Sequence, residues 1–163
     1  MLSIKKAGIR EIPLIRKLTL IIWPQTYSSI ISSKQMAYML EMMYSPVSLQ
    51  KQMNEEGCTF IVAYDEDEAV AFASYNEIIP YTWKLNKIYI LPSQQGKGTG
   101  RFIINHIITE IKKEGANFLQ LQVNRHNQAK LFYEKLGFKI IDISDFDIGN
   151  GFFMNDYVME LAL

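Results

Sequence analysis

The sequence has few of the features that mark secreted or membrane-spanning proteins. Its 163 residues include one cysteine, Cys58, so no internal disulfide can form. The segment Met1–Pro13 contains several charged residues and no continuous apolar core of the kind that a signal peptide needs. Apolar runs such as Leu20–Trp23 are far shorter than the roughly 20 residues required to cross a bilayer. We therefore expect a soluble, cytoplasmic protein without a membrane partner.

The sequence also lacks an excess of either charge and any pattern typical of a metal site. Its 17 basic and 17 acidic residues cancel, and a pI near 6.7 gives no long-range field that would hold a nucleic acid. His106 and His126 have no Cys or carboxylate at metal-ligand spacing around them. The length is that of one domain, so we expect a single domain over residues 1–163, with no nucleic-acid partner and no metal. Both a monomer and a homodimer are compatible with the sequence.

Helices are predicted in the first third of the chain. Apolar residues recur at helical spacing before Trp23-Pro24, and proline lacks the amide hydrogen that a continuing helix needs. Ser32 and Gln35 have the spacing of a capping box, and Ser45 precedes a proline suited to a first helical turn. The predicted helices run from about Glu11 to Ile22, from Ser32 onward, and from Ser45 to near Gly57.

The rest of the chain alternates strand and helix signals. An acidic turn separates two runs typical of a hairpin, and later segments switch between alternating and helical apolar patterns. The expected fold is mixed α/β (α+β), with helices flanking one largely antiparallel central sheet. The predicted strands are Thr59–Tyr64, Ala69–Tyr75, Lys84–Leu91, Phe118–Asn124, Phe138–Ile143 and about Phe152–Leu161, and the predicted helices are Gly98–Glu114 and about Ala129–Leu136.

A glycine-rich loop, Gln95–Gly100, joins a predicted strand to the long predicted helix. A loop in this position directs amide hydrogens and the positive end of a helix at one point, which suits a phosphate or pyrophosphate. The loop has neither the Gly-Lys-Ser/Thr ending of a nucleotide P-loop nor the G-x-G-x-x-G dinucleotide pattern. Judged on glycine content alone, a simple strand-to-helix connection explains it equally well.

The surrounding residues add specificity to this loop. Gln95, Gly98 and Gly100 follow the pattern Gln/Arg-x-x-Gly-x-Gly/Ala, preceded by Ile88–Pro92 and followed by Asn127–Phe138. In these segments the chain resembles the GNAT superfamily of N-acetyltransferases. The helical first third and the ending Gly149–Tyr157 more loosely resemble its bacterial diamine/polyamine branch.

The resemblance implies a GNAT-like sheet that is splayed at the strand binding acetyl-CoA. It further implies transfer of an acetyl group from acetyl-CoA to a primary amine of a small molecule, by direct attack in a ternary complex. Polyamines such as spermidine are the leading acceptor class. The alternatives are acetylation of a protein or peptide amine or of an antibiotic, and a non-catalytic acyl-CoA-binding module.

The resemblance also implies roles for particular residues. The backbone at Ile88 and Ile90 would pair with the pantetheine arm like an added strand. Asn127 would bond the pantetheine, although Asn is also favoured as the N-cap of the following helix, and the two roles are equally compatible with the sequence. The pyrophosphate would be held by the amides of Gln95, Gly96, Lys97, Gly98, Thr99, Gly100 and Arg101.

The chemistry of acetyl transfer needs an acid, an oxyanion donor and a base. Tyr133 matches the tyrosine that protonates the coenzyme A sulfur in many relatives; its other role would be packing beside Phe132. A backbone amide near Ile90 or Leu91 would bond the oxyanion. Many relatives carry a glutamate two residues before the position of Ile88, and here that residue is Asn86, which cannot accept a proton. We expect Glu77 to be the base, with Asp156 the second candidate, although both residue types are more often solvated surface carboxylates. The alternatives are a chain of waters and bulk solvent acting on an amine whose pKa falls when it is desolvated.

Overall fold

The computed structural model describes all 163 residues and contains one seven-stranded sheet, in the order β1-β2-β3-β4-β5-β7-β6. All neighbouring strands are antiparallel except β4 and β5, which are joined by a crossover through α4. The predicted mixed α/β fold with a largely antiparallel sheet is confirmed. The elements are β1 Leu2–Ala7, α1 Ile12–Tyr27, α2 Ser33–Tyr44, α3 Pro46–Asn54, β2 Thr59–Asp65, β3 Glu68–Ile79, β4 Thr82–Ile90, α4 Thr99–Lys113, β5 Phe118–Asn124, α5 Ala129–Lys135, β6 Lys139–Gly149 and β7 Phe152–Ala162, with short 3₁₀ turns at Ile9–Glu11 and Pro92–Gln94.

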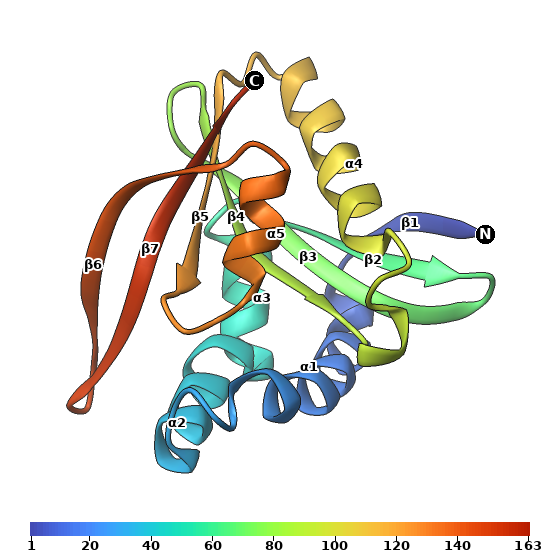
Figure 1. The fold of residues 1–163 in the computed structure, drawn as a ribbon. Coiled ribbons are helices and arrows are strands. Elements are labelled where there is room, and N and C mark those ends of the chain that lie inside the picture. Colours follow the sequence, from blue (N-terminus) through green and yellow to red (C-terminus); the bar gives the residue numbers. More distant parts are fainter.

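Helices cover both faces of the sheet, and each face has its own apolar core (Figure 1). Helices α1, α2 and α3 pack on one face, where Phe60 and Phe72 are fully buried. Helices α4 and α5 pack on the other face, where Ile103 of α4 and Leu119 of β5 are fully buried. None of these helices combines the length and apolar character needed to span a membrane.

The sheet opens in its middle, as the predicted splay required. Strand β4 pairs with β5 only from Thr82 to Leu85, and beyond that point the two strands diverge (Figure 1). At the same point β4 contains a bulge, because Leu85 pairs with Tyr75 and Lys87 with Ser74, which leaves Asn86 as an extra residue. A bulge bends the strand and changes which side chains share a face. The opening between β4 and β5 is therefore built into the strand itself.

The prediction that the first helix ends at Trp23-Pro24 is wrong, because α1 continues to Tyr27 with Pro24 inside it. A proline within a helix costs about 3 kcal/mol or more, since it removes one hydrogen bond and crowds the preceding turn. The aromatic contacts of the preceding residue, Trp23, offset part of that cost. Trp23 is 1% exposed and its ring lies 4.7 Å from Tyr27, 5.4 Å from Tyr44 and 5.7 Å from Tyr89, measured between centroids.

The structure also adds a strand that the sequence patterns did not predict. Residues Leu2–Ala7 form β1, which pairs antiparallel with β2 at one edge of the sheet. Its outward residues include Lys5 and Lys6, and lysines are common on edge strands because they discourage pairing with another chain.

Candidate active site

A cavity of about 810 Å³, called here the main cavity, lies along the opening between β4 and β5. Its walls come from the end of α1, from β4 and β5, from the loop before α4 and from the start of α5. The structure thus brings together most of the residues singled out in the sequence. Those that line the cavity are Ile88, Ile90, Gln95, Gly96, Gly98, Thr99, Gly100, Arg101, Asn127 and Tyr133, whereas Lys97 and Glu77 lie outside it.

The loop before α4 presents a group of unpaired amides. No backbone or side-chain acceptor within the protein bonds the N–H groups of Gly96, Gly98, Thr99, Gly100 and Arg101, whereas Gln95 donates to the Pro92 carbonyl and Lys97 to that of Gln94. Gly98 has a φ of +81° as the N-cap of α4, a conformation that side chains rarely adopt. Unpaired amides at a helix N-terminus form an anion site, so this loop can bind a pyrophosphate.

Two contacts that the sequence did not reveal hold this loop in place. The buried Gln94 side chain donates to Asp65 Oδ2 at 3.0 Å and accepts from Thr99 Oγ1 at 3.2 Å, which ties the loop to β2 and to α4. At Gly100, a Cβ atom would lie only 3.0 Å from Phe132 Cζ of α5. A side chain at this position would therefore press against Phe132, so Gly100 permits the close packing of α4 on α5.

The edge of β4 beyond Leu85 has free backbone groups. The Leu91 amide donates to the Val70 carbonyl of β3 at 2.9 Å. Because alternate residues of a strand direct their backbone groups to opposite edges, Ile88 and Ile90 direct theirs away from β3, toward the space that β5 has left. Of the two amides considered for the oxyanion, Leu91 is already bonded, which leaves Ile90.

Tyr133 of α5 faces the main cavity with its ring packed between Phe132 and Phe138, at centroid distances of 5.5 and 5.8 Å. The side chain is 8% exposed, and its hydroxyl makes no hydrogen bond within the protein. Burial raises the pKa of the Tyr133 hydroxyl well above its usual value, with a smaller contribution from Tyr27. The hydroxyl therefore keeps its proton at neutral pH and can donate it to a bound group.

Asn127 lies at the start of α5 and lines the main cavity. Its Oδ1 accepts a hydrogen bond from the amide of Ala129, the first residue of α5, at 2.9 Å, although the N-cap residue of this helix is Gln128. Its side chain also lies within hydrogen-bonding reach of Tyr27, a contact that partly opposes the rise in the pKa of Tyr27, and it lines the main cavity beside that residue.

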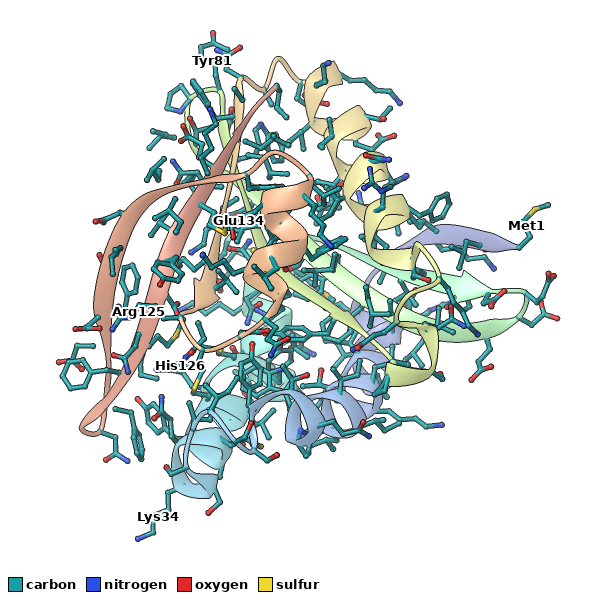
Figure 2. All side chains as sticks on the ribbon, viewed as in Figure 1. Met1, Lys34, Tyr81, Arg125, His126 and Glu134 are labelled. Atoms are coloured by element: carbon teal, nitrogen blue, oxygen red, sulfur yellow. The ribbon has the colours of Figure 1, made fainter.

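Glu77 lies at the far end of β3, near the turn into β4. Its side chain is exposed and accepts a hydrogen bond from the Tyr81 amide at 3.1 Å. Figure 2 labels Tyr81 at this turn, well away from His126, which lines the main cavity. The structure does not bring Glu77 together with the other predicted site residues.

A second cavity of about 210 Å³, called here the side cavity, adjoins the main one. Tyr27, Asn86, Tyr89 and Gln122 line both, so the two spaces meet at these side chains. The walls of the side cavity also include methionines of α2 and β7 and three charged residues. The methionines are Met39, Met43 and Met154, and the charged residues are Lys84, Lys87 and Asp156.

Asp156 of β7 carries the one carboxylate in the side cavity. The residue is 4% exposed, and its carboxylate makes no hydrogen bond or ion pair within the protein. Burial raises the pKa of Asp156 to about 6, partly opposed by the charges of Arg125 and Lys84. Register places Asp156 opposite Asn124, on the part of β5 that has separated from β4. A carboxylate with this pKa can accept a proton near neutral pH.

Tyr27 is a site residue that the sequence analysis missed. It stands on the last turn of α1, lines both cavities, and its hydroxyl lies 2.9 Å from that of Tyr89. It was missed because the helix was predicted to end at about Ile22, before Trp23-Pro24. The spacing of four residues between Trp23 and Tyr27 is a signal that could have extended the helix to this point.

Comparison with known proteins identifies the family. The model of the acetyltransferase (GNAT) domain matches residues 28–161. The [ribosomal protein bS18]-alanine N-acetyltransferase of Haemophilus influenzae is 33% identical over 79 residues, which are 48% of this chain and 53% of that protein. The chain thus matches about half the length of such curated relatives.

Solved structures agree over the whole chain. The PaiA N-acetyltransferase of Thermoplasma acidophilum, in complex with coenzyme A, superposes with a TM-score of 0.83 at 23% identity, covering 100% of this chain and 99% of that one. The ribosomal-protein-S18-alanine N-acetyltransferase of Escherichia coli gives a TM-score of 0.70 at 21% identity, covering 99% and 94%. At these identities the likeness shows a common fold.

Proposed function

The chain belongs to the GNAT acetyltransferase family, and from its site we propose that it transfers an acetyl group from acetyl-CoA to the primary amine of a small molecule. The observation that carries the proposal is the continuity of the two cavities. A loop of unpaired amides lies along the main cavity, and a buried carboxylate lines the side cavity that joins it. The first suits a pyrophosphate, and the second suits an amine that must lose a proton.

The residues of the main cavity fit acetyl-CoA, the co-substrate of this family. The amides of Gly96, Gly98, Thr99, Gly100 and Arg101 would hold the pyrophosphate, and the free edge of β4 at Ile88 and Ile90 would bond the pantetheine amides. When bound, acetyl-CoA supplies an acetyl thioester, whose carbonyl carbon is the electrophile. The volume of about 810 Å³ lies within the roughly 300–1,000 Å³ of ligand pockets.

The chain's own residues would then move the protons of a direct transfer. Asp156 accepts the proton that the amine loses as its nitrogen bonds the acetyl carbon. The Ile90 amide bonds the negative charge that develops on the acetyl oxygen. Tyr133 donates its proton to the sulfur as the carbon–sulfur bond breaks, and it is reprotonated by solvent. Glu77 was the first candidate for the base, and we assign the role to Asp156 because Glu77 lies outside both cavities.

The size of the side cavity supports a small acceptor. Its volume of about 210 Å³ is below the roughly 300 Å³ at which drug-sized ligand pockets begin. Polyamines are the acceptor class that the sequence resemblance suggests. A protein N-terminus is the second candidate, favoured by the relative named for acetylating an alanine of ribosomal protein bS18.

The test is release of free coenzyme A thiol from acetyl-CoA in the presence of amines. The panel contains amino acids, a polyamine and a peptide with an N-terminal alanine, and a blank without amine subtracts the signal of the protein's own thiol, Cys58. We expect thiol release that depends on the amine, with the acetylated product seen by mass spectrometry. Tight binding of acetyl-CoA without turnover of any amine would instead support a non-catalytic acyl-CoA-binding module.

A further inference from the structure

We propose that the acceptor carries a carboxylate beside its amine, as an amino acid does, and that Lys84 and Lys87 bind this carboxylate in the side cavity. The inference rests on the proposed function and names its substrate class. Both lysines line the side cavity, together with Asp156 and the methionines of α2 and β7.

The bulge at Asn86 is what places both lysines in one cavity. In a regular strand, residues three apart point to opposite faces. Because Asn86 is an extra residue in the pairing with β3, Lys84 and Lys87 share a face, while Leu85 and Ile88 both pack into the core on the other side. The feature that opens the sheet thus also gathers two positive charges at the acceptor's end of the site.

Neither lysine forms an ion pair, although the charge of Asp156 raises the pKa of Lys84 and that of Glu56 raises the pKa of Lys87, each by less than burial lowers it. Lys84 Nζ donates to Gln122 Oε1, and Lys87 Nζ donates to Gln52 Oε1 at 2.8 Å. Lys87 Nζ also lies over the ring of Tyr44, 5.1 Å from its centroid. None of the ion pairs of the protein involves either lysine. Burial lowers the pKa of both ammonium groups, that of Lys87 to about 8. A bound carboxylate would supply the missing counter-charge.

The position of the reacting amine fixes how such an acceptor lies. The amine has to reach the thioester beside Ile88 and Ile90, so it sits where the two cavities meet, at Tyr27, Asn86, Tyr89 and Gln122. The rest of the acceptor then extends into the side cavity, where the methionine side chains offer a flexible apolar wall. An α-amino acid with an apolar side chain has all three parts: the amine, the anion and the apolar group.

The same charges disfavour a polyamine. The side cavity is lined by two lysines and one aspartate, and by no arginine or other carboxylate. Its net charge at neutral pH is therefore positive. A polyamine would bring further ammonium groups into this space, and like charges repel strongly where water is scarce. The lysines therefore select against the acceptor class that the sequence resemblance suggested.

The experiment compares acceptors that differ only in the carboxylate. Leucine and methionine are each paired with their amino alcohols, leucinol and methioninol, and spermidine and an alanine peptide are assayed beside them. We expect kcat/KM of wild type to be about 10- to 100-fold higher for the amino acids, the range typical of a hydrogen bond to a charged group. Lys84→Met and Lys87→Met should remove this preference, because they should lower kcat/KM for the amino acids about 10- to 100-fold more than kcat/KM for the amino alcohols.

Lys51→Met, which removes an exposed lysine of α3, is the matched control and should keep the preference. Calorimetric binding of acetyl-CoA shows that each variant is folded. Three results would overturn the inference and leave the transferase proposal standing. In the first, wild type turns over amino acids and amino alcohols equally; in the second, it prefers spermidine or the peptide. In the third, the lysine variants lose equally on both members of a pair. Release of thiol with none of the amines would overturn both.

Discussion

Replacing Asp156 by Asn should stabilise the fold at neutral pH while removing activity. The pKa of Asp156 is raised by burial from its ordinary value of 3.8 to about 6. Because the folded state binds this proton more tightly than the unfolded state does, the carboxyl stabilises the fold fully at pH values below its unfolded pKa. This contribution to the free energy of unfolding is lost as pH rises through the folded pKa of about 6. A difference of about two pKa units, at about 1.4 kcal/mol each, sets an upper bound of ~3 kcal/mol. We expect Asp156→Asn to gain about 1–3 kcal/mol at pH 7.5 and almost nothing at pH 4.

The activity of the same variant should change in the opposite direction. If Asp156 takes a proton from the bound ammonium group, kcat/KM of wild type is flat from about pH 6 up to the pKa of the amine and falls tenfold per unit below pH 6. Without a base, only the free amine reacts, and for an amine of pKa near 10.4 that form is scarce at pH 7. The variant should lose about 10²–10³-fold at pH 7 and recover tenfold per pH unit as pH rises.

Two measurements check this pair of opposite effects. Urea unfolding at pH 4 and pH 7.5 gives the change in the free energy of unfolding, and initial rates between pH 5 and 10 give the profile of kcat/KM. A profile for Asp156→Asn that is parallel to that of wild type at every pH would exclude Asp156 as the base. An unchanged or lowered stability at pH 7.5 would show that the buried carboxylate has a partner, in conflict with the cause given for its raised pKa.

Three further substitutions test the rest of the site. Gly98→Trp should weaken acetyl-CoA binding by more than about 100-fold in calorimetry, because the tryptophan side chain would enter the open space beside the unpaired amides. The control is Gly57→Trp, at a glycine that also has a positive φ and open space around it, and this variant should bind acetyl-CoA normally. Tyr133→Phe should lower turnover about 10²- to 10⁴-fold and change the urea midpoint little, since the hydroxyl has no partner in the protein; full activity would leave Tyr133 a packing residue. Glu77→Gln should keep the pH profile of wild type, and a loss that disappears at high pH would return the role of base to Glu77.

Much of the fold could be predicted because its signals are local. Ser32 and Ser45 lie three residues before the amides that their side chains bond, at 3.1 and 3.2 Å, so both helix starts can be read from a few residues. The same is true of Gly98, where the turn before α4 requires a positive φ. The loop that faces the main cavity was therefore found, together with the helix and strands around it.

What could not be predicted depends on contacts between distant residues. Trp23 tolerates the following proline because its ring packs against Tyr44 and Tyr89, which are far away in sequence. Glu77 and Asp156 have no local features that separate a surface carboxylate from a buried one. Only the pairing of β5 with β7 shows that Asp156 lies at the opening of the sheet.

The bulge at Asn86 could have been predicted from the pattern of apolar residues in β4. Apolar residues of β4 occupy odd positions at Trp83 and Leu85 and even positions at Ile88 and Ile90, and all four pack into the same core. In a regular strand the residues on one face are all odd-numbered or all even-numbered, so a change from odd to even requires an inserted residue. The pattern therefore locates the bulge between Leu85 and Ile88. In this protein the pairing of β4 with β5 ends at the same point, so the change also marks where a ligand can approach the strand.

The bulge also gives a physical reason for the base to lie on another strand. Asn86 Nδ2 donates to Asn76 Oδ1 at 2.8 Å, and the residue stands between Lys84 and Lys87 on β4. A carboxylate at this position would be held ionised by two neighbouring ammonium groups, which lowers its pKa and makes it a weak base near neutral pH. Asp156, on the far side of the opening, is kept near 6 by burial. With asparagine at position 86, the lysines remain free to bind an acceptor's carboxylate, and proton acceptance is left to Asp156.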